Sequence, residues 1–395
     1  MRSVALMLLT AWTCLPAMAH AGGDLLFNVT LEYDQDRNHV ATQSAFDDLA
    51  QHLSRSIGRN VKLVMTQNAE RVGERIRTGT YAILLAPAQL VGLAMRNGYT
   101  PVARTEEETQ VALVAAKGAR ASSLETARGR RIALPHRESL VSYLVRGEMN
   151  ALGLSPSRHF GQVMHMNQYG AVTYALDIGQ AELVAARSND VDELLRRNPG
   201  ARVIRTLPAV PTGGVVVHDQ LEAGLEDRIR AAFTRMDKAL EARLQRSHFG
   251  AFEPADRTDF EFVSTRGFFT PEVLPGASVV TAEQVRRLMA RNVPLFDVRS
   301  QAQYREGHIA GARNVPYRMN SPKEVDYDDS VDTFDLGKLP QDKSAPMIFQ
   351  CNGAECWYSY KAANYMVRRG FKKVYWFRTG LPAWKAAGYP LRQGG

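Results

Sequence analysis

Residues 347–357 read MIFQCNGAECW, and this stretch decides the fold of the C-terminal part of the chain. A short apolar strand ends at Gln350, Cys351 follows at once, and a tight loop leads to Cys356 and a helical pattern from Trp357. Successive N–H groups of such a loop can form a concavity that holds an anion, and the positive end of the next helix adds to this effect. We therefore expect Cys351 to be a thiolate nucleophile near neutral pH.

Further short motifs surround this cysteine loop. The sequence Asp-Val-Arg occupies residues 297–299, GHIAGA occupies 307–312, and GLPAW occupies 380–384. In order and spacing, these motifs and the loop resemble the rhodanese family. The resemblance implies a rhodanese-like three-layer α/β domain with a parallel sheet over residues 279–395.

The same resemblance assigns roles to the residues of the loop. Cys351 would accept and donate sulfane sulfur as a persulfide, without a metal or an organic cofactor. The donor would be a small sulfur compound, and the acceptor a thiol or another nucleophile. The backbone of the loop would cradle the outer sulfur atom, and the residues concerned are Asn352, Gly353, Ala354 and Glu355.

Cys356 and several charged residues leave alternatives open. Cys356 either resolves the persulfide by forming a disulfide with Cys351, or is held away from it by the curl of the loop. Many active relatives carry arginine beside the nucleophile and at the end of the loop, where this chain has Asn352 and Cys356, so thiosulfate is a doubtful donor. We expect Asp297, Arg299 and His308 to brace the fold through hydrogen bonds rather than to contact the substrate. The acidic stretch 324–335 is either a surface insertion or a rim that selects a periplasmic protein partner.

The first part of the chain alternates between strand and helix patterns, which predicts parallel sheets covered by helices. A long helix is expected over residues 221–244. Expected strands lie at 25–31, 61–65, 81–85, 111–115, 131–134 and 214–217, and the other expected helices at 45–56, 69–77, 88–97, 139–151 and 169–178.

The runs at 77–87, 98–104 and 128–133 resemble the periplasmic solute-binding proteins of the phosphonate and phosphite type. This resemblance implies a two-lobed periplasmic-binding-protein type II fold over residues 24–245, with a small anionic solute held in the cleft. The first lobe would comprise residues 24–105 and 207–245, and the second residues 106–206.

Candidate solute-binding residues follow from the ends of the expected strands. Ser139 begins a helix after the loop 135–139, so it is either a ligand donor or only a helix cap. Arg137 is expected to add positive charge, and Tyr33 and Tyr169 are the aromatic candidates. Only one hydroxyl remains at Ser139 where the relatives have three, so the solute is expected to differ from a bare phosphonate.

The chain of 395 residues is long enough for several domains, and its 45% hydrophobic content excludes a disordered chain. Residues 1–21 predict a cleaved signal peptide, with Cys14 inside it, and hence a periplasmic protein without a membrane span. Residues 246–278 are expected to be an ordered connector rich in Pro, Gly and Phe. The formal net charge of +8 favours anions, but basic residues do not interleave with aromatics, so nucleic acid is not an expected partner.

Three functions remain open on this sequence. The preferred one is an exported sulfurtransferase that uses Cys351, with a solute-binding module in front of it. The alternatives are a solute-binding or sensing protein without catalysis, and a thiol–disulfide exchanger that uses Cys351 and Cys356.

Overall fold

The computed structural model describes residues 23–32, 39–152, 154–246, 249, 251–266, 269–325 and 327–394. The expected signal peptide and Tyr33 lie outside these ranges. Contacts divide the chain into two compact units, Met1–Glu108 with Val210–Ser264, and Thr109–Ala209 with Thr265–Gly395. None of the helices within the described ranges is both long and apolar enough to cross a membrane.

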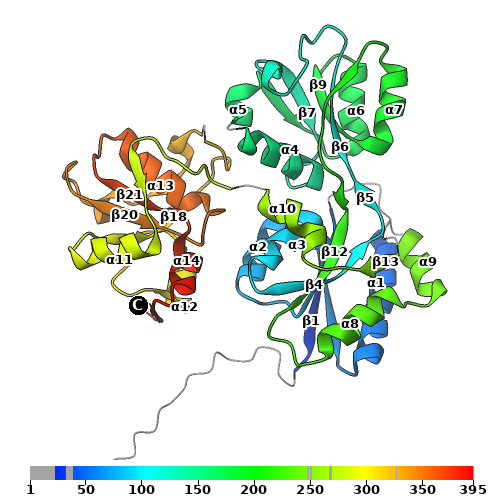
Figure 1. Ribbon diagram of the computed structural model, residues 1–395, viewed down its shortest axis with the longest axis horizontal. Coiled ribbons are helices and arrows are strands. Elements are labelled where there is room, and N and C mark those ends of the chain that lie inside the picture. Colours follow the sequence, from blue (N-terminus) through cyan, green and yellow to red (C-terminus); the bar gives the residue numbers. More distant parts are fainter. Residues whose placement is uncertain are drawn as a thin grey trace, which may run out of the picture. The chain divides into compact units, whose positions relative to one another are not determined.

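The first unit contains a six-stranded sheet flanked by helices (Figure 1). In sheet order the strands are β13 (Phe252–Pro254), β4 (Tyr99–Thr105), β12 (Gly213–His218), β3 (Ile83–Pro87), β1 (Leu25–Thr30) and β2 (Val61–Thr66). The helices are α1 (His39–Ile57), α2 (Ala69–Arg77), α3 (Ala88–Met95), α8 (Leu225–Thr234) and α9 (Lys238–Arg246), and α10 (Glu261–Thr265) follows β13 along the chain. Phe46, Leu49 and Leu53 of α1 are fully buried in the core, as their helical spacing predicts.

Two expectations for this part of the chain are wrong. The sheet is mixed, because β12 runs antiparallel to both β3 and β4. The predicted helix over 221–244 is two helices, α8 and α9. Asp237 separates them, because its carboxylate accepts hydrogen bonds from the N–H groups of Ala239 and Leu240 and so begins a new helix.

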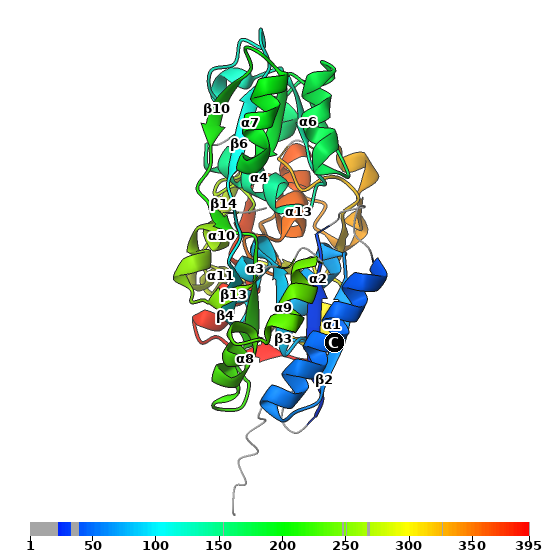
Figure 2. The ribbon, with the colours of Figure 1, turned by 90° about the vertical axis from the view of Figure 1, so that its right-hand side faces the viewer.

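Residues 109–209 carry a five-stranded sheet of their own. In sheet order its strands are β10 (Arg202–Thr206), β6 (Val111–Ala115), β9 (Leu183–Arg187), β7 (Arg131–Leu134) and β8 (Gln162–His165). Its helices are α4 (Leu140–Ala151), α5 (Pro156–His159), α6 (Tyr169–Asp177) and α7 (Ser188–Arg197), of which α6 and α7 lie side by side (Figure 2). This sheet is also mixed, because β6 runs antiparallel to β9 and β10. Since β7 is parallel to β8 and β9, the carboxyl ends of these three strands share one edge.

The C-terminal module has the predicted parallel sheet between two layers of helices. In sheet order its strands are β14 (Ala277–Val279), β21 (Val374–Phe377), β20 (Met347–Gln350), β15 (Leu295–Asp297) and β17 (Arg313–Asn314), all parallel. The helices are α11 (Ala282–Ala290), α12 (Gln301–Glu306), α13 (Trp357–Arg368) and α14 (Gly380–Ala386). One apolar cluster joins the sheet to α13, and a second joins it to α11 and α14.

Short strand pairs complete the molecule, and a buried lysine ties one of them to α13. The two-residue strands are β16 (His308–Ile309) with β22 (Leu391–Arg392), β18 (Tyr317–Arg318) with β19 (Thr333–Phe334), and β5 (Glu108–Thr109) with β11 (Val210–Pro211).

Lys361 of α13 is fully buried and donates hydrogen bonds to the carbonyls of Ser321 and Pro322 at 3.1 and 2.8 Å. Its Nζ lies 3.8 Å from a carboxylate oxygen of Asp332, so the acidic stretch is fastened to the helix that follows the cysteine loop.

Candidate active site

Cys351 and Cys356 form a disulfide at the carboxyl end of β20. Their Cα atoms are 6.0 Å apart, within the range that a disulfide spans. Cys351 is fully buried in the apolar cluster that packs on α13, whereas Cys356 is half-buried and directly precedes α13. Of the two cysteines, Cys356 is therefore the more exposed residue.

Hydrogen bonds to its carbonyl groups hold the loop between the two cysteines. The N–H of Cys356 donates to Gly353, and the N–H of Leu381 donates to the carbonyl of Cys351, both at 2.9 Å. The carbonyl of Ala354 accepts two hydrogen bonds from Thr270, one from its N–H and one from its Oγ1. By contrast, the N–H groups of residues 352–354 donate no hydrogen bond to any residue that the structure describes. These unused donors provide the chemistry expected of an anion cradle.

An ion pair braces the adjacent strand end. Asp297 and Arg299 are buried, and the guanidinium approaches the carboxylate at 2.5 Å. Arg299 also donates to the carbonyl of Gly307 at 2.8 Å and, more weakly, to the side chain of Asn352 at 3.4 Å. His308 is buried, and its Nδ1 lies 2.9 Å from the carbonyl of Tyr304. These contacts agree with the bracing role expected for Asp297, Arg299 and His308.

Gln350, directly before Cys351, is fully buried. Neither its amide oxygen nor its amide nitrogen has a hydrogen-bond partner among the described residues. It pairs with Asp297 and Phe377 across the sheet, and side chains alternate along a strand, so Gln350 faces away from the cluster that contains Cys351. An unpaired amide at this depth costs stability.

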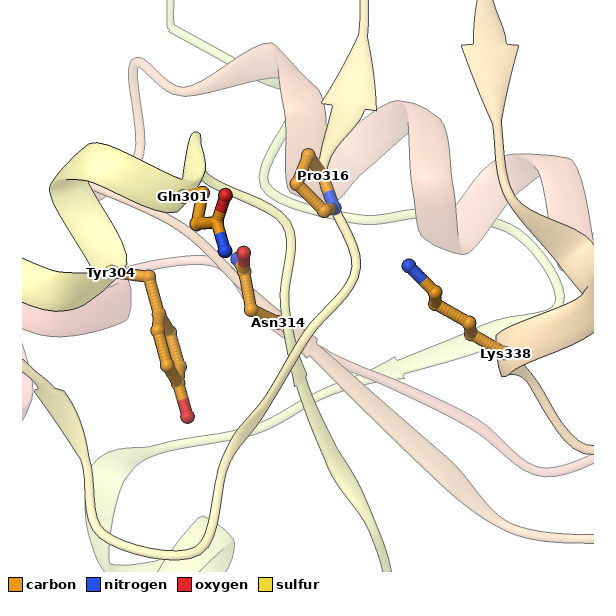
Figure 3. Close-up of a pocket in the computed structure, with 5 residues that line it drawn as sticks. All are labelled: Gln301, Tyr304, Asn314, Pro316 and Lys338. Atoms are coloured by element: carbon orange, nitrogen blue, oxygen red, sulfur yellow. The ribbon is translucent and has the colours of Figure 1, made fainter. Parts of the chain in front are cut away.

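A cavity of about 270 Å³ lies in the C-terminal module (Figure 3). It is lined by Gln301, Tyr304, Asn314, Pro316 and Lys338; the side chains of Gln301 and Asn314 lie close together, and Lys338 extends from the opposite side. Across the sheet, Asn314 pairs with Asp297, and Asp297 pairs with Gln350, the residue before Cys351. The cavity therefore lies near the carboxyl ends of the strands, where Cys351 also lies. No group of acidic, histidine and cysteine side chains suited to a metal ion occurs among the described residues.

A second set of polar residues gathers at the shared edge of β7, β8 and β9. Ser139 is buried, and its side chain accepts a hydrogen bond from the N–H of Ser142 at 3.2 Å, so it does cap α4. Arg137 is exposed in the loop after β7. At the start of α6, the ring of Tyr169 lies 4.2 Å from the guanidinium carbon of Arg187, which also contacts Asp190 at 3.3 Å.

His165 belongs to the same edge. It ends β8, and its Nδ1 lies 2.9 Å from the carbonyl of Pro135, in the loop that carries Arg137. Burial lowers the pKa of His165. Three of the four predicted solute-binding residues, Arg137, Ser139 and Tyr169, therefore lie along one edge of one sheet, and Tyr33 is not described.

Sequence reasoning missed Arg187 and Thr270. Arg187 directly follows the apolar run LVAA, so its place at a strand end could have been read from the sequence. Thr270 belongs to the connector, and only the fold brings it to the loop.

These features define a class of protein: a solute-binding fold followed by a domain with a cysteine loop. Residues 33–260 match the family model for the periplasmic substrate-binding protein of phosphonate ABC transporters, and residues 281–387 match that for the rhodanese-like domain. The chain belongs to the phosphonate-binding periplasmic substrate-binding protein family and carries a rhodanese-like domain at its C-terminal end.

Individual relatives match single modules. A thiosulfate sulfurtransferase GlpE of Pseudomonas fluorescens is 30% identical over 111 residues, which are 28% of this chain and 86% of that protein. An HTH-type transcriptional regulator of Mycobacterium tuberculosis is 29% identical over 120 residues, which are 30% of this chain and 46% of the regulator, so less than half of that relative is spanned. XAC2383 from Xanthomonas citri, solved with a chloride ion, has a TM-score of 0.50 at 17% identity and covers 61% of this chain and 96% of its own; this likeness concerns the fold.

Proposed function

We propose that the protein is an exported sulfurtransferase that carries sulfane sulfur as a persulfide on Cys351, while its first module binds a small anionic solute. The observation that carries the proposal is the position of Cys351, at a strand end and followed by three N–H groups without acceptors among the described residues. Such donors stabilise a thiolate or the terminal charge of a persulfide. Membership of a periplasmic family supports export.

In the proposed reaction the Cys351 thiolate attacks the sulfane sulfur of the donor. The bond between that sulfur and the rest of the donor breaks, and the donor leaves as an anion, sulfite in the case of thiosulfate. A thiol or cyanide then takes the outer sulfur and releases the Cys351 thiolate. The reduced form of the loop is required, because in the disulfide the Cys351 sulfur is bonded to that of Cys356 and no thiolate is available.

Cys356 supplies a second route by which sulfur leaves. Its thiolate attacks the inner sulfur of the Cys351 persulfide, the two cysteines form their disulfide, and the outer sulfur departs as hydrosulfide. An external dithiol then restores both thiols by attack at Cys356, the half-buried partner. The observed disulfide supports this cycle, and it also favours the second candidate function, thiol–disulfide exchange without sulfur transfer.

Mass spectrometry of the reduced protein tests the proposal. After incubation with thiosulfate or an organic persulfide, the Cys351 peptide is expected to gain one sulfur atom, and a Cys351→Ser variant is expected to lose all transfer to cyanide. Transfer that survives this substitution would exclude Cys351 as the carrier. A Cys351 that cycles only between thiol and disulfide would leave the exchanger as the function.

Titration calorimetry of the full chain tests the solute-binding half. Thiosulfate, sulfite, phosphate and methylphosphonate are suitable probes, and binding of at least one oxyanion is expected. Failure of all four would exclude a small oxyanion as the solute.

A further inference from the structure

The segment that leaves the solute-binding module reaches the cysteine loop directly. The first compact unit ends at Ser264, and Thr270 lies only six positions later in the chain. Thr270 is 2% exposed and donates both its N–H, at 2.9 Å, and its Oγ1, at 2.7 Å, to the carbonyl of Ala354. Two donors on one carbonyl fix the orientation of that peptide group.

Arg378 holds Thr270 in place from the other side. It follows β21, and its guanidinium donates to the carbonyl of Thr270 at 2.8 Å and to that of Pro271 at 2.9 Å. The guanidinium is half-buried, and this burial lowers the pKa of Arg378. Arg378 therefore contacts Thr270, and Thr270 contacts Ala354. Ala354 lies three positions after Cys351 in the chain.

The geometry of the peptide bond transmits this hold to the interior of the loop. In a trans peptide the C=O and the following N–H point in opposite directions. Because the carbonyl of Ala354 points toward Thr270, the N–H of Glu355 points away from Thr270. The neighbouring peptide is fixed in the same manner, since the carbonyl of Gly353 accepts from the N–H of Cys356. With both carbonyls held, the N–H groups of Ala354 and Glu355 keep fixed directions.

We propose that Thr270 and Arg378 are positioning residues for the sulfur-carrying loop, and that the connector thereby sets the reactivity of Cys351. This inference rests on the proposed function. It also names a physical link between the solute-binding module and the sulfur-carrying loop. A displacement of the chain after Ser264 acts on the loop through the two hydrogen bonds from Thr270.

The test is the pH dependence of alkylation at Cys351 in the reduced full-length protein, followed on the Cys351 peptide by mass spectrometry with iodoacetamide. Thr270→Val keeps the shape of the side chain and removes its hydroxyl donor. It is expected to raise the pKa of the Cys351 thiol and to slow alkylation at neutral pH by about three- to tenfold, the effect of one hydrogen bond. The limiting rate at high pH should not change.

Two controls isolate the hydroxyl group. Thr270→Ser keeps the donor, and Val273→Ala alters a 70% exposed residue of the same connector, so both should behave as the parent protein. If Thr270→Val did not fold, Arg378→Met would serve, because it removes both donors to the carbonyls of Thr270 and Pro271 and keeps an unbranched apolar side chain. Identical pH profiles for Thr270→Val and Thr270→Ser would overturn the inference. Failure of the proposed function would look different: the parent Cys351 would take no sulfur from any donor, whatever its alkylation profile.

Discussion

Gly380 packs so closely against the backbone of Cys351 that a Cβ at position 380 would overlap the carbonyl oxygen of Cys351. Gly380 also has a φ of +51°, a conformation that side-chain-bearing residues rarely adopt. The start of α14 thus packs against the strand end that carries Cys351, and the N–H of Leu381 donates to the carbonyl of Cys351.

We predict that Gly380→Ala lowers the free energy of unfolding by at least about 2 kcal/mol, since backbone strain and overpacking add together. It should also abolish sulfur transfer, because the displaced atom is the carbonyl oxygen of Cys351. Gly388→Ala is the matched control: its φ is +73°, and a Cβ there meets nothing within 4 Å. Urea unfolding and transfer assays on both variants would contradict the prediction if they gave equal losses.

Gln350→Met should stabilise the protein by about 1 to 3 kcal/mol, because it removes two buried polar atoms that lack partners and roughly keeps the volume. Gln350→Glu should destabilise it, since a carboxylate would be buried at the same place. Thermal unfolding of the two variants checks both signs. A fall in melting temperature for Gln350→Met would mean that the amide has a partner in solution.

Cys356→Ser should distinguish two routes by which sulfur leaves Cys351: transfer to an external acceptor and release as sulfide. The variant is expected to accept a persulfide on Cys351 and to pass it to cyanide, but to release far less sulfide to a dithiol, because the resolving thiol is gone. Sulfide release is measured by methylene blue formation, with Cys351→Ser as the inactive reference. Undiminished release would assign the attack to the external thiol instead.

Lys361 should make stability depend on pH above neutrality. Burial lowers the pKa of Lys361 to about 8, from 10.5 for an ordinary lysine. Between these values the unfolded chain binds more protons than the folded one, so the contribution of this group to the unfolding free energy rises with pH.

The variant Lys361→Met removes this rise and, at neutral pH, costs about 1 to 3 kcal/mol, because the carbonyls of Ser321 and Pro322 lose their donor. Asp332 remains satisfied in the variant: although burial alone would raise its pKa, hydrogen bonds from Ser321, Tyr317 and Asn320 hold it below its ordinary value. The difference between the two proteins, followed by urea unfolding from about pH 8 to about pH 10.5, isolates Lys361. A difference that does not change over this range would contradict the assignment.

Arg187→Met should weaken binding of whichever oxyanion the calorimetry identifies by about tenfold or more, the usual loss for a hydrogen bond to a charged group. Arg197→Met is the control, because Arg197 is the last residue of α7, the helix that follows Arg187, and it pairs there with Asp177 and Glu193. Equal affinities for the two variants would show that the solute does not bind at this edge of the sheet.

Local sequence patterns predicted several of the longer elements, such as β1, β7 and α4, but not β4, β8 or β9. The order of strand, cysteine and helix around Cys351 depends on neighbours along the chain and can be read directly. The break at Asp237 shows the limit of such reasoning, because its apolar spacing continues across the break while a side-chain cap overrides it. The antiparallel pairing of β12 with β3, and that of β6 with β9, depend on which strands become neighbours in each sheet. The alternation of strand and helix patterns along the chain does not specify these neighbours.

The candidate site was predictable to a similar extent. Cys351, Cys356 and the loop between them lie together in sequence, and so do Arg137 and Ser139. Thr270, Arg378 and Gly380 act on the loop from other parts of the chain, and each matters for what its backbone or side chain touches after folding. Their residue types alone carry no signal of that role.

The position of Thr270 also bears on how the protein can be dissected. The rhodanese-like match begins at residue 281, so expression boundaries drawn from it would discard both donors to Ala354 while leaving every recognisable motif intact. A truncated domain prepared in this way would report the chemistry of a loop that has lost its bonds to residue 270, and we expect kinetic constants measured on it to differ from those of the intact polypeptide.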